Sequence, residues 1–246
     1  MSIIDAVKQI SIEQAEVWAR RYFGCDPGDV PYTGAYFNSI GSAEHDPNQF
    51  TVGDLYSLQC LAVNVPARAG LFLLETHANV AKRLLAQIPD DLCIGALSCD
   101  RFHELLGTGS PALELWNLLR ANWAKLADDT HENIHEPAPT GRWGMGPTRV
   151  SKLMARKRPH LIPIEDSVVN RVIGTDAKDT WKEWWHALTT DPEPLTSMAG
   201  TVRDAAKIPE LSTLRALDIV LWMKGKHDWN CEDGASCREA HVPDGM

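Results

Sequence analysis

The sequence has no run of about 18 apolar residues, which is the length that a membrane-spanning helix needs. Its start, MSIIDAVKQISIEQAEVWARR, lacks the basic segment and apolar core of a secretory signal. Positive charge is also scarce, because 24 Lys and Arg stand against 33 Asp and Glu, for a formal net charge of −9. We therefore expect a cytoplasmic protein, and one that binds nucleic acid only if its cations gather locally.

The sequence has no CxxC pair, which is the spacing that makes a zinc site convincing. A cytosolic chain of 246 residues also has no need of disulfides. The C-terminal part does hold ligand types that zinc prefers, in the set His227, Cys231, Cys237 and His241. A loose polar tail is the alternative, and no metal or cofactor is predicted there.

Strand signals are few, and helical signals dominate. The one β-like segment, HLIPI at 160–164, contains Pro163, which does not fit a central strand. Ser11 begins a capping pattern, and Ser110-Pro111 places a cap before a proline in the first helical turn. Apolar periodicity predicts further helices over 69–88, 147–157, 166–173, 177–188, 197–206 and 212–224. The fold class that we predict is all-α.

The composition allows one core or two small lobes that share a cleft, since 44% of the residues are apolar. Residues 128–142 are polar and contain prolines, as a connector would. We therefore expect a single two-lobed helical domain over 1–246. It would comprise an N-terminal wrapping segment (1–50), a helical lobe (51–127), the connector (128–142) and a second lobe (143–246).

The most informative stretch is GRWGMGPTRVSKLMARKRPHLIPIEDSVVNRV, at 141–172. Gly144-Met145-Gly146 directly precedes an expected helix, and glycines permit positive φ and close backbone approach. Pro147 fits the first turn of that helix. Backbone amides at a helix N-terminus can bind anions, so this turn is a candidate phosphate site.

Cations are concentrated in the same stretch. From Arg142 to Arg158 there are six basic residues and no acidic one, and the rest of the chain has 18 basic residues against 33 acidic ones. This local excess predicts a phosphate-binding helix. A solvated basic helix face is the alternative. The candidate phosphate-binding cations are Arg149, Lys152, Arg156, Lys157 and Arg158.

These residues carry a resemblance to a known superfamily. GMGPTRVSK at 144–152 resembles the helix-hairpin-helix signature of the DNA glycosylases that include endonuclease III. In that superfamily a catalytic aspartate opens the next helix, in a pattern like V-D-T-H-x-x-R-V, and here IEDSVVNRV stands at 164–172. Asp166 follows Thr148 by 18 residues, as the family pattern requires. SKLMARKRPHLIPIEDSVV and LRALDIVLWM are also similar to an uncharacterised bacterial family of unknown function.

The resemblance implies a protein that binds duplex DNA and flips one base into the cleft. The DNA-binding residues would be the five cations with Gly144, Met145, Gly146 and Thr148, and Asp166 would be the catalytic residue. The helix N-terminus that Asp166 caps would help to keep its carboxylate ionised. The alternative is that Asp166 serves only as an N-cap, in a non-catalytic DNA-binding module.

Two departures from the family pattern decide which kind of glycosylase the resemblance implies. Thr148 stands where bifunctional members have a Schiff-base lysine, and Lys152 lies one helical turn later. The enzyme would therefore resemble the monofunctional members, which use water. Only two cysteines follow Asp166, where members with an iron–sulfur cluster have four, so no cofactor is implied.

A competing motif is HENIH at 131–135, which matches the HExxH pattern of zinc hydrolases. Zinc would be bound by His131 and His135, with Glu132 as the base. Asp128-Asp129 precede the motif and Pro137 follows it, whereas such motifs lie inside long apolar helices. A polar loop is therefore the favoured interpretation, and the zinc hydrolase is kept as a lesser alternative.

Aromatic residues offer weaker signals. Tyr32, Tyr36 and Phe37 either line a pocket for a flipped base or anchor a loop. The helical spacing of Trp181, Trp184, Trp185 and Leu188 favours packing over base stacking. Asp218 lies in the apolar run LRALDIVLWM and is expected to pair with Arg215 or another nearby base.

Overall fold

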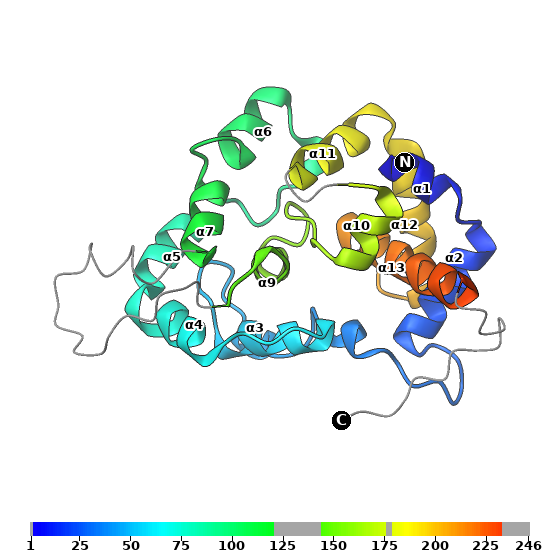
Figure 1. Ribbon diagram of the computed structural model, residues 1–246, viewed down its shortest axis with the longest axis horizontal. Coiled ribbons are helices and arrows are strands. Elements are labelled where there is room, and N and C mark those ends of the chain that lie inside the picture. Colours follow the sequence, from blue (N-terminus) through cyan, green and yellow to red (C-terminus); the bar gives the residue numbers. More distant parts are fainter. Residues whose placement is uncertain (1, 121–143, 176–178, 233–246) are drawn as a thin grey trace.

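The computed structural model describes residues 2–120, 144–175 and 179–232, with side chains to residue 229. Within these ranges the protein consists of helices and connecting segments, and the only β feature is an isolated bridge between Asp46 and Gln49 (Figure 1). The predicted all-α class is therefore confirmed. None of the described helices combines the length and the apolarity that crossing a membrane requires.

After residue 144 every predicted helix is present and α9 has the predicted bounds, but α12 begins five residues earlier and α13 ends eight residues later than predicted. The α-helices are α1 (Ile3–Lys8), α2 (Ile12–Phe23), α3 (Val52–Ser57), α4 (Ala67–Leu71), α5 (Ala78–Leu85), α6 (Cys99–Leu106), α7 (Pro111–Arg120), α9 (Pro147–Lys157), α10 (Ser167–Ile173), α11 (Thr180–Thr190), α12 (Pro192–Ala206) and α13 (Thr213–Glu232). Short 3₁₀ turns include η1 (Thr33–Tyr36), η3 (Leu58–Leu61) and η5 (Ile94–Ala96).

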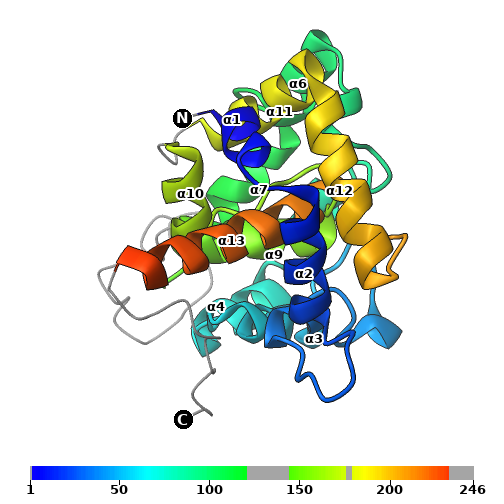
Figure 2. The same cartoon turned by 90° about the vertical axis from the view of Figure 1, so that its right-hand side faces the viewer.

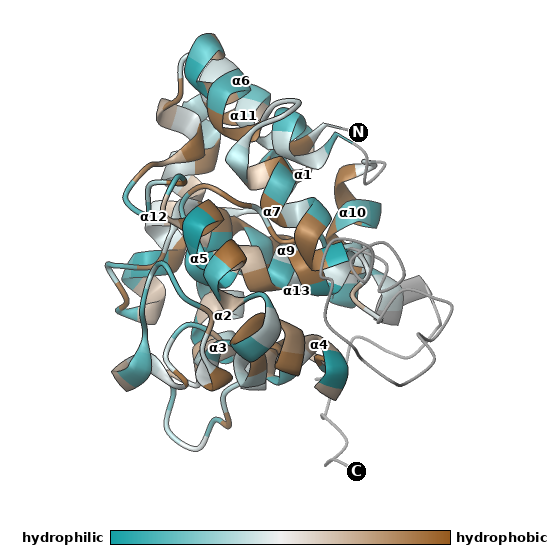
Figure 3. Cartoon of the chain, turned by 90° about the vertical axis from the view of Figure 1, so that its left-hand side faces the viewer, coloured by the Kyte–Doolittle hydropathy of each residue, from teal (hydrophilic) through white to brown (hydrophobic). Residues whose placement is uncertain are grey.

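Polar caps begin several of these helices. Ser11 accepts a hydrogen bond from Gln14 N at the start of α2, and Thr51 forms a reciprocal capping box with Asp54 at the start of α3. In amphipathic helices such as α5 and α6 the apolar residues then lie on one side (Figure 3). The caps fix where each helix starts, and the apolar side fixes which face it buries.

The single helix predicted over 69–88 is wrong. The structure divides it into α4, a π-helical turn over Phe72–Thr76, and α5. The wider turn is closed by the hydrogen bond from His77 N to Phe72 O, at 2.8 Å, and the two rings stack with centroids 3.9 Å apart. The chain therefore buries Phe72 and Leu73 by forming a π-helical turn in place of a regular α-helical one.

The N-terminal helices are part of the core and do not wrap its outside. α1 and α2 pack against α12, and α2 also contacts α13 (Figure 2). Ile3, Val7, Trp18 and Tyr22 are buried by this packing. The wrapping role expected for residues 1–50 is thus limited to the segment that follows α2.

α9 lies near the centre of the molecule in Figure 1. It packs against α3, η3 and α7, and all its residues from Val150 to Lys157 are buried. The HLIPI segment that follows forms no strand, but residues 161–164 are buried and lead to α10. Because α9 is packed between other elements, the cations in its last turns lie inside the protein.

Candidate functional site

Of the two glycines in the turn before α9, only Gly144 has the positive φ that the sequence suggested. Gly144 has φ +82°, and a Cβ there would lie 2.9 Å from Pro66 Cγ. Gly146 is the N-cap of α9, with extended backbone and open space around its Cα. Arg149 donates to Gly144 O at 2.7 Å and to Asn64 O at 2.6 Å, so its guanidinium holds the turn in place. Met145 is buried beneath it.

The basic end of α9 points into the protein. Arg156 donates to Asp54 Oδ1 at 3.2 Å and to the carbonyl oxygens of Phe37 and Ile40. Lys157 forms an ion pair with Asp54 and donates to Asp46 O at 2.9 Å. Burial lowers the pKa of Lys157, and the Asp54 carboxylate opposes that effect. Asp54 thus neutralises two cations inside the core.

Arg158 is also a buried cation bonded to groups inside the protein, but it has no carboxylate in hydrogen-bond range. Its side chain is 1% exposed, and its guanidinium donates five hydrogen bonds. The acceptors are the carbonyl oxygens of Pro47, Leu85, Ile88 and Lys157 together with Asn48 Oδ1. This one side chain therefore ties the segment after α2 to the end of α5.

These contacts correct the expectation of an exposed basic helix face. Arg156, Lys157 and Arg158 are buried, and their charged groups bind carbonyls of the same chain. A phosphate could reach them only if these bonds broke and the core opened. The physical reason is that residues 37–48 cross the end of α9 and present their carbonyl oxygens to it. We assign the three residues to the scaffold.

Lys152 is also buried, but its ammonium group faces the predicted catalytic residue. Lys152 Nζ lies 3.1 Å from Asp166 Oδ2 and also donates to Leu61 O at 3.0 Å. Asp166 is the N-cap of α10, where its Oδ1 accepts from Val168 N at 2.9 Å. The carboxylate thus has one oxygen on the helix cap and the other on the lysine, and its side chain is 18% exposed.

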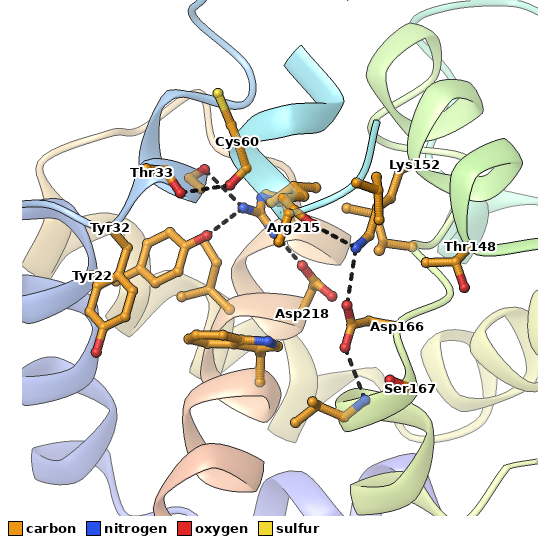
Figure 4. A pocket seen from close by; sticks show the side chains of 18 of the residues that line it. Tyr22, Tyr32, Thr33, Cys60, Thr148, Lys152, Asp166, Ser167, Arg215 and Asp218 are labelled. Atoms are coloured by element: carbon orange, nitrogen blue, oxygen red, sulfur yellow. Dashed lines mark hydrogen bonds and ion pairs between the residues drawn. The ribbon is translucent and has the colours of Figure 1, made fainter. Parts of the chain in front are cut away.

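This ion pair lies on the wall of a pocket of about 360 Å³, drawn in Figure 4. Thr148 and Lys152 reach it from α9, Asp166 and Ser167 from the start of α10, and Arg215 from α13. The opposite wall comes from the N-terminal part of the chain, with Tyr22, Tyr32, Thr33 and Gly34. The exposed Lys226 of α13 also lines it. We call this space the Asp166 pocket.

Aromatic side chains form one side of the Asp166 pocket. The rings of Tyr22 and Tyr32 stack with centroids 5.4 Å apart and an angle of 6°. Trp222 meets both rings edge-on, at 6.3 Å and 5.7 Å. Gly34 is required beside them, because a Cβ at this position would lie 1.9 Å from the Tyr22 hydroxyl. The pocket therefore combines flat apolar faces with a charged wall.

A second buried ion pair lies at the same pocket. Arg215 pairs with Asp218, as the sequence predicted, and it donates to the Tyr22 hydroxyl at 2.7 Å and to Gly34 O at 3.0 Å. Burial is the largest cause of the raised pKa of Asp218; the Arg215 guanidinium opposes the rise, and the Asp166 carboxylate adds to it. Arg215 and Asp218 thus hold the aromatic wall against α13.

The remaining residues that the sequence singled out lie in the wall of the Asp166 pocket, in the core or on the surface. Of the three N-terminal aromatics, Tyr32 lines the pocket, Phe37 is buried in the core, and Tyr36 is half exposed. Trp184 is buried and Trp185 stacks on Phe102, as the packing interpretation predicted.

HENIH at 131–135 lies outside the described residues, as do Cys237 and His241. Among the described residues, no group of three His, Cys, Asp or Glu side chains could hold a metal ion.

Sequence reasoning offered Tyr32 and the Arg215–Asp218 pair, but it missed Tyr22 and Trp222. Tyr22 and Trp222 come from helices about 200 positions apart, and no local motif joins them. One signal did exist, because a charged pair inside an apolar run, as at Arg215 and Asp218, indicates a buried polar cluster. The pocket wall opposite Asp166 therefore depends on tertiary packing.

Comparison with known families gives one assignment. A family of unknown function, DUF6308, matches residues 15–225. The chain belongs to this family. The match spans α9, α10 and most of α13, and it thus includes both walls of the Asp166 pocket. No curated protein and no solved structure matches the chain.

Proposed function

We propose that this DUF6308 protein hydrolyses the N-glycosidic bond of a damaged or modified nucleotide in duplex DNA. The observation that carries the proposal is the Asp166 pocket, where a carboxylate paired with an ammonium group faces stacked aromatic rings. Its volume lies in the range of about 300–1,000 Å³ that ligand pockets occupy. Bases stack on aromatic faces, and a carboxylate stabilises the positive charge that develops on the sugar.

The residues then have separate roles in the proposed reaction. A water oxygen would bond to the sugar C1′ as the C1′–N bond breaks, and the departing base would carry the bonding electrons and take up a proton. Asp166 would accept the proton of the water, and Lys152 would hold the carboxylate in position through Oδ2. The α10 cap fixes the other oxygen, so the carboxylate is oriented before substrate binds.

The turn over Gly144–Gly146 supports a DNA substrate, together with its resemblance to the helix-hairpin-helix signature. The open space at Gly146 allows a phosphate to approach the backbone at the start of α9. Thr148 and Arg149 lie beside this turn and complete the contact in our proposal. The first helix of the expected hairpin lies outside the described residues.

The experiment measures base release from duplexes that carry a panel of damaged or modified bases, with alkali to reveal abasic sites. Asp166→Asn keeps a helix cap, because asparagine also caps well, but it removes the carboxylate. We expect wild type to cleave at least one duplex, and Asp166→Asn to lose about 10³-fold or more in rate. Asp29→Asn, which changes an exposed carboxylate that does not line the pocket, is the matched control.

The outcomes separate the alternatives. DNA binding without cleavage, equal in wild type and Asp166→Asn, would indicate a non-catalytic DNA-binding module and overturn the proposed chemistry. Cleavage that EDTA abolishes would instead favour a metal-dependent hydrolase. Equal activity in all three proteins would remove Asp166 from the mechanism.

The burial of the α9 cations favours a second candidate, the hydrolysis of a free nucleoside. The charged groups of these residues cannot bind phosphates while they are bonded to acceptors inside the core, which weakens the electrostatic case for a polymer substrate. The residues are Arg156, Lys157 and Arg158. Free nucleosides therefore belong in the same panel. Turnover of a nucleoside with no activity on any duplex would keep Asp166 as the catalytic residue and change the substrate class.

A further inference from the structure

The protein has a second, larger pocket on the other side of α9. Its volume is about 660 Å³, and it lies among α6, α7, α11 and the N-terminal turn of α9. Figure 1 shows α7 to the left of α9, α6 and α11 above it, and α10, α13 and α2 to its right. Glu165 lines this pocket, and its neighbour Asp166 lines the first. We call it the Glu165 pocket.

The Glu165 pocket contains buried polar atoms without partners. Glu165 is 5% exposed and Thr180 is 2% exposed, and Glu165 Oε2 and Thr180 Oγ1 have no hydrogen-bond partner. Arg120 Nε and Trp181 Nε1 are buried and unpartnered at the same pocket. Leaving a buried polar group unsatisfied costs about 1–3 kcal/mol, so four together indicate that a ligand completes the site.

The chemistry of these atoms defines the ligand. Arg120 and Trp181 offer N–H donors, Glu165 offers a carboxyl oxygen, and Thr180 can do either. Flat apolar surface comes from Phe102, Trp116 and Trp181, and the Trp116 and Trp181 rings meet edge-on at 5.6 Å. The lining holds two cations, Arg120 and Lys182, and two acids, Glu165 and Asp179, so it gives no net attraction to a phosphate or carboxylate. The ligand should thus be flat, uncharged and equipped with both donors and acceptors.

We propose that the Glu165 pocket is a second binding site, for a planar heterocycle of the purine or pyrimidine class. Its ring would stack on the aromatic side chains, and its N–H groups would donate to Glu165. Its carbonyl or ring nitrogen would accept from Arg120 and Trp181. This site does not depend on glycosidic chemistry at Asp166, because its polar groups line a different pocket.

The test is binding of free nucleosides to the full chain, measured by calorimetry and by ligand-observed NMR. Guanosine, adenosine, cytidine and uridine are compared with ribose and inorganic phosphate, which lack the planar ring. We expect at least one nucleoside to bind, and ribose and phosphate not to bind. Glu165→Gln replaces an accepting carboxyl oxygen by an amide N–H donor, and Thr180→Val removes a hydroxyl group. Both preserve shape, so each should weaken binding at least tenfold.

Asp166→Asn is the matched variant, because it changes the neighbouring residue in the other pocket. It should leave this affinity unchanged, even if it abolishes base release. Circular dichroism of each variant confirms that it is folded. The proposal is overturned if no nucleoside binds, if ribose or phosphate binds equally well, or if folded Glu165→Gln and Thr180→Val both retain wild-type affinity. Binding that only Asp166→Asn removes would assign the ligand to the Asp166 pocket and also overturn it.

Discussion

Arg158 uses all five N–H groups of its guanidinium on acceptors inside the protein. Four of the acceptors are backbone carbonyls, and they come from three separate parts of the chain. The side chain thus has the geometry of a structural cross-link. A basic residue at the end of a basic helix need not face solvent, because carbonyl oxygens can accept the hydrogen bonds that its N–H groups would otherwise donate to water.

Arg158→Lys tests this role, because lysine keeps the charge and lacks the planar fork. We expect the variant to be less stable by about 3 kcal/mol, since an ammonium group has three donors and leaves some buried carbonyls unpaired. Urea denaturation measures the change. Arg101→Lys, at an exposed arginine that pairs with Glu104, is the control and should change stability by less than about 0.5 kcal/mol. Equal stability of the two variants would contradict the cross-link.

At the scale of elements, the start of a helix could be predicted better than the direction of its side chains. Pro147 in the first turn of α9 and Asp166 as the cap of α10 were both recognisable, because caps are local signals. The burial of the α9 cations was not recognisable. The groups that neutralise Arg156 come from residues 102 to 119 positions earlier, and the charge pattern of one helix carries no information about them.

The two glycines before α9 give a matched pair of variants. Gly144 has positive φ and lies against Pro66, so Gly144→Ala should destabilise the protein by about 1–2 kcal/mol and lower its melting temperature by several degrees. Gly146 has extended backbone and open space, so Gly146→Ala should leave the melting temperature nearly unchanged. Differential scanning calorimetry of both variants measures the contrast.

The same two glycine variants also test whether the turn binds DNA phosphates. If DNA phosphates approach the backbone at Gly146, the added methyl group should weaken DNA binding while the melting temperature stays the same. Similar melting temperatures for the two variants would contradict the assignment of the backbone strain to Gly144 alone. Unchanged DNA affinity in Gly146→Ala would place the phosphate contact elsewhere.

At the scale of the whole molecule, one buried segment separates two pockets of different chemistry. The chain from Ile164 to Asp166 and the first turn of α9 contribute to both. Glu165 N donates to Ser151 Oγ at 2.9 Å, which fixes this segment to α9. The sequence could place Glu165 and Asp166 side by side at the start of a helix. It could not show that they line different pockets, because that depends on helices α6, α7 and α11 on one side and α2 and α13 on the other.

The burial of Glu165 has a consequence for the stability of the whole protein. Burial raises the pKa of Glu165 to about 7 from 4.5, against an opposing effect of the Arg120 guanidinium. Between these values the folded state holds a proton that the unfolded state has lost. The free energy of unfolding should therefore fall as pH rises from about 4.5 to about 7, by roughly 3 kcal/mol at most, and this loss stays constant above that range.

Glu165→Gln isolates this effect, because glutamine does not titrate. The difference in unfolding free energy between Glu165→Gln and wild type should shift in favour of the variant by roughly 3 kcal/mol from pH 4.5 to pH 8. Urea denaturation at several pH values measures it, and Glu210→Gln, at an exposed glutamate, should show no such shift. A flat difference for Glu165→Gln would mean that the pKa of Glu165 is the same in the folded and unfolded states. A nucleoside bound in the Glu165 pocket should reduce the shift, because N–H donors from the ligand would stabilise the carboxylate.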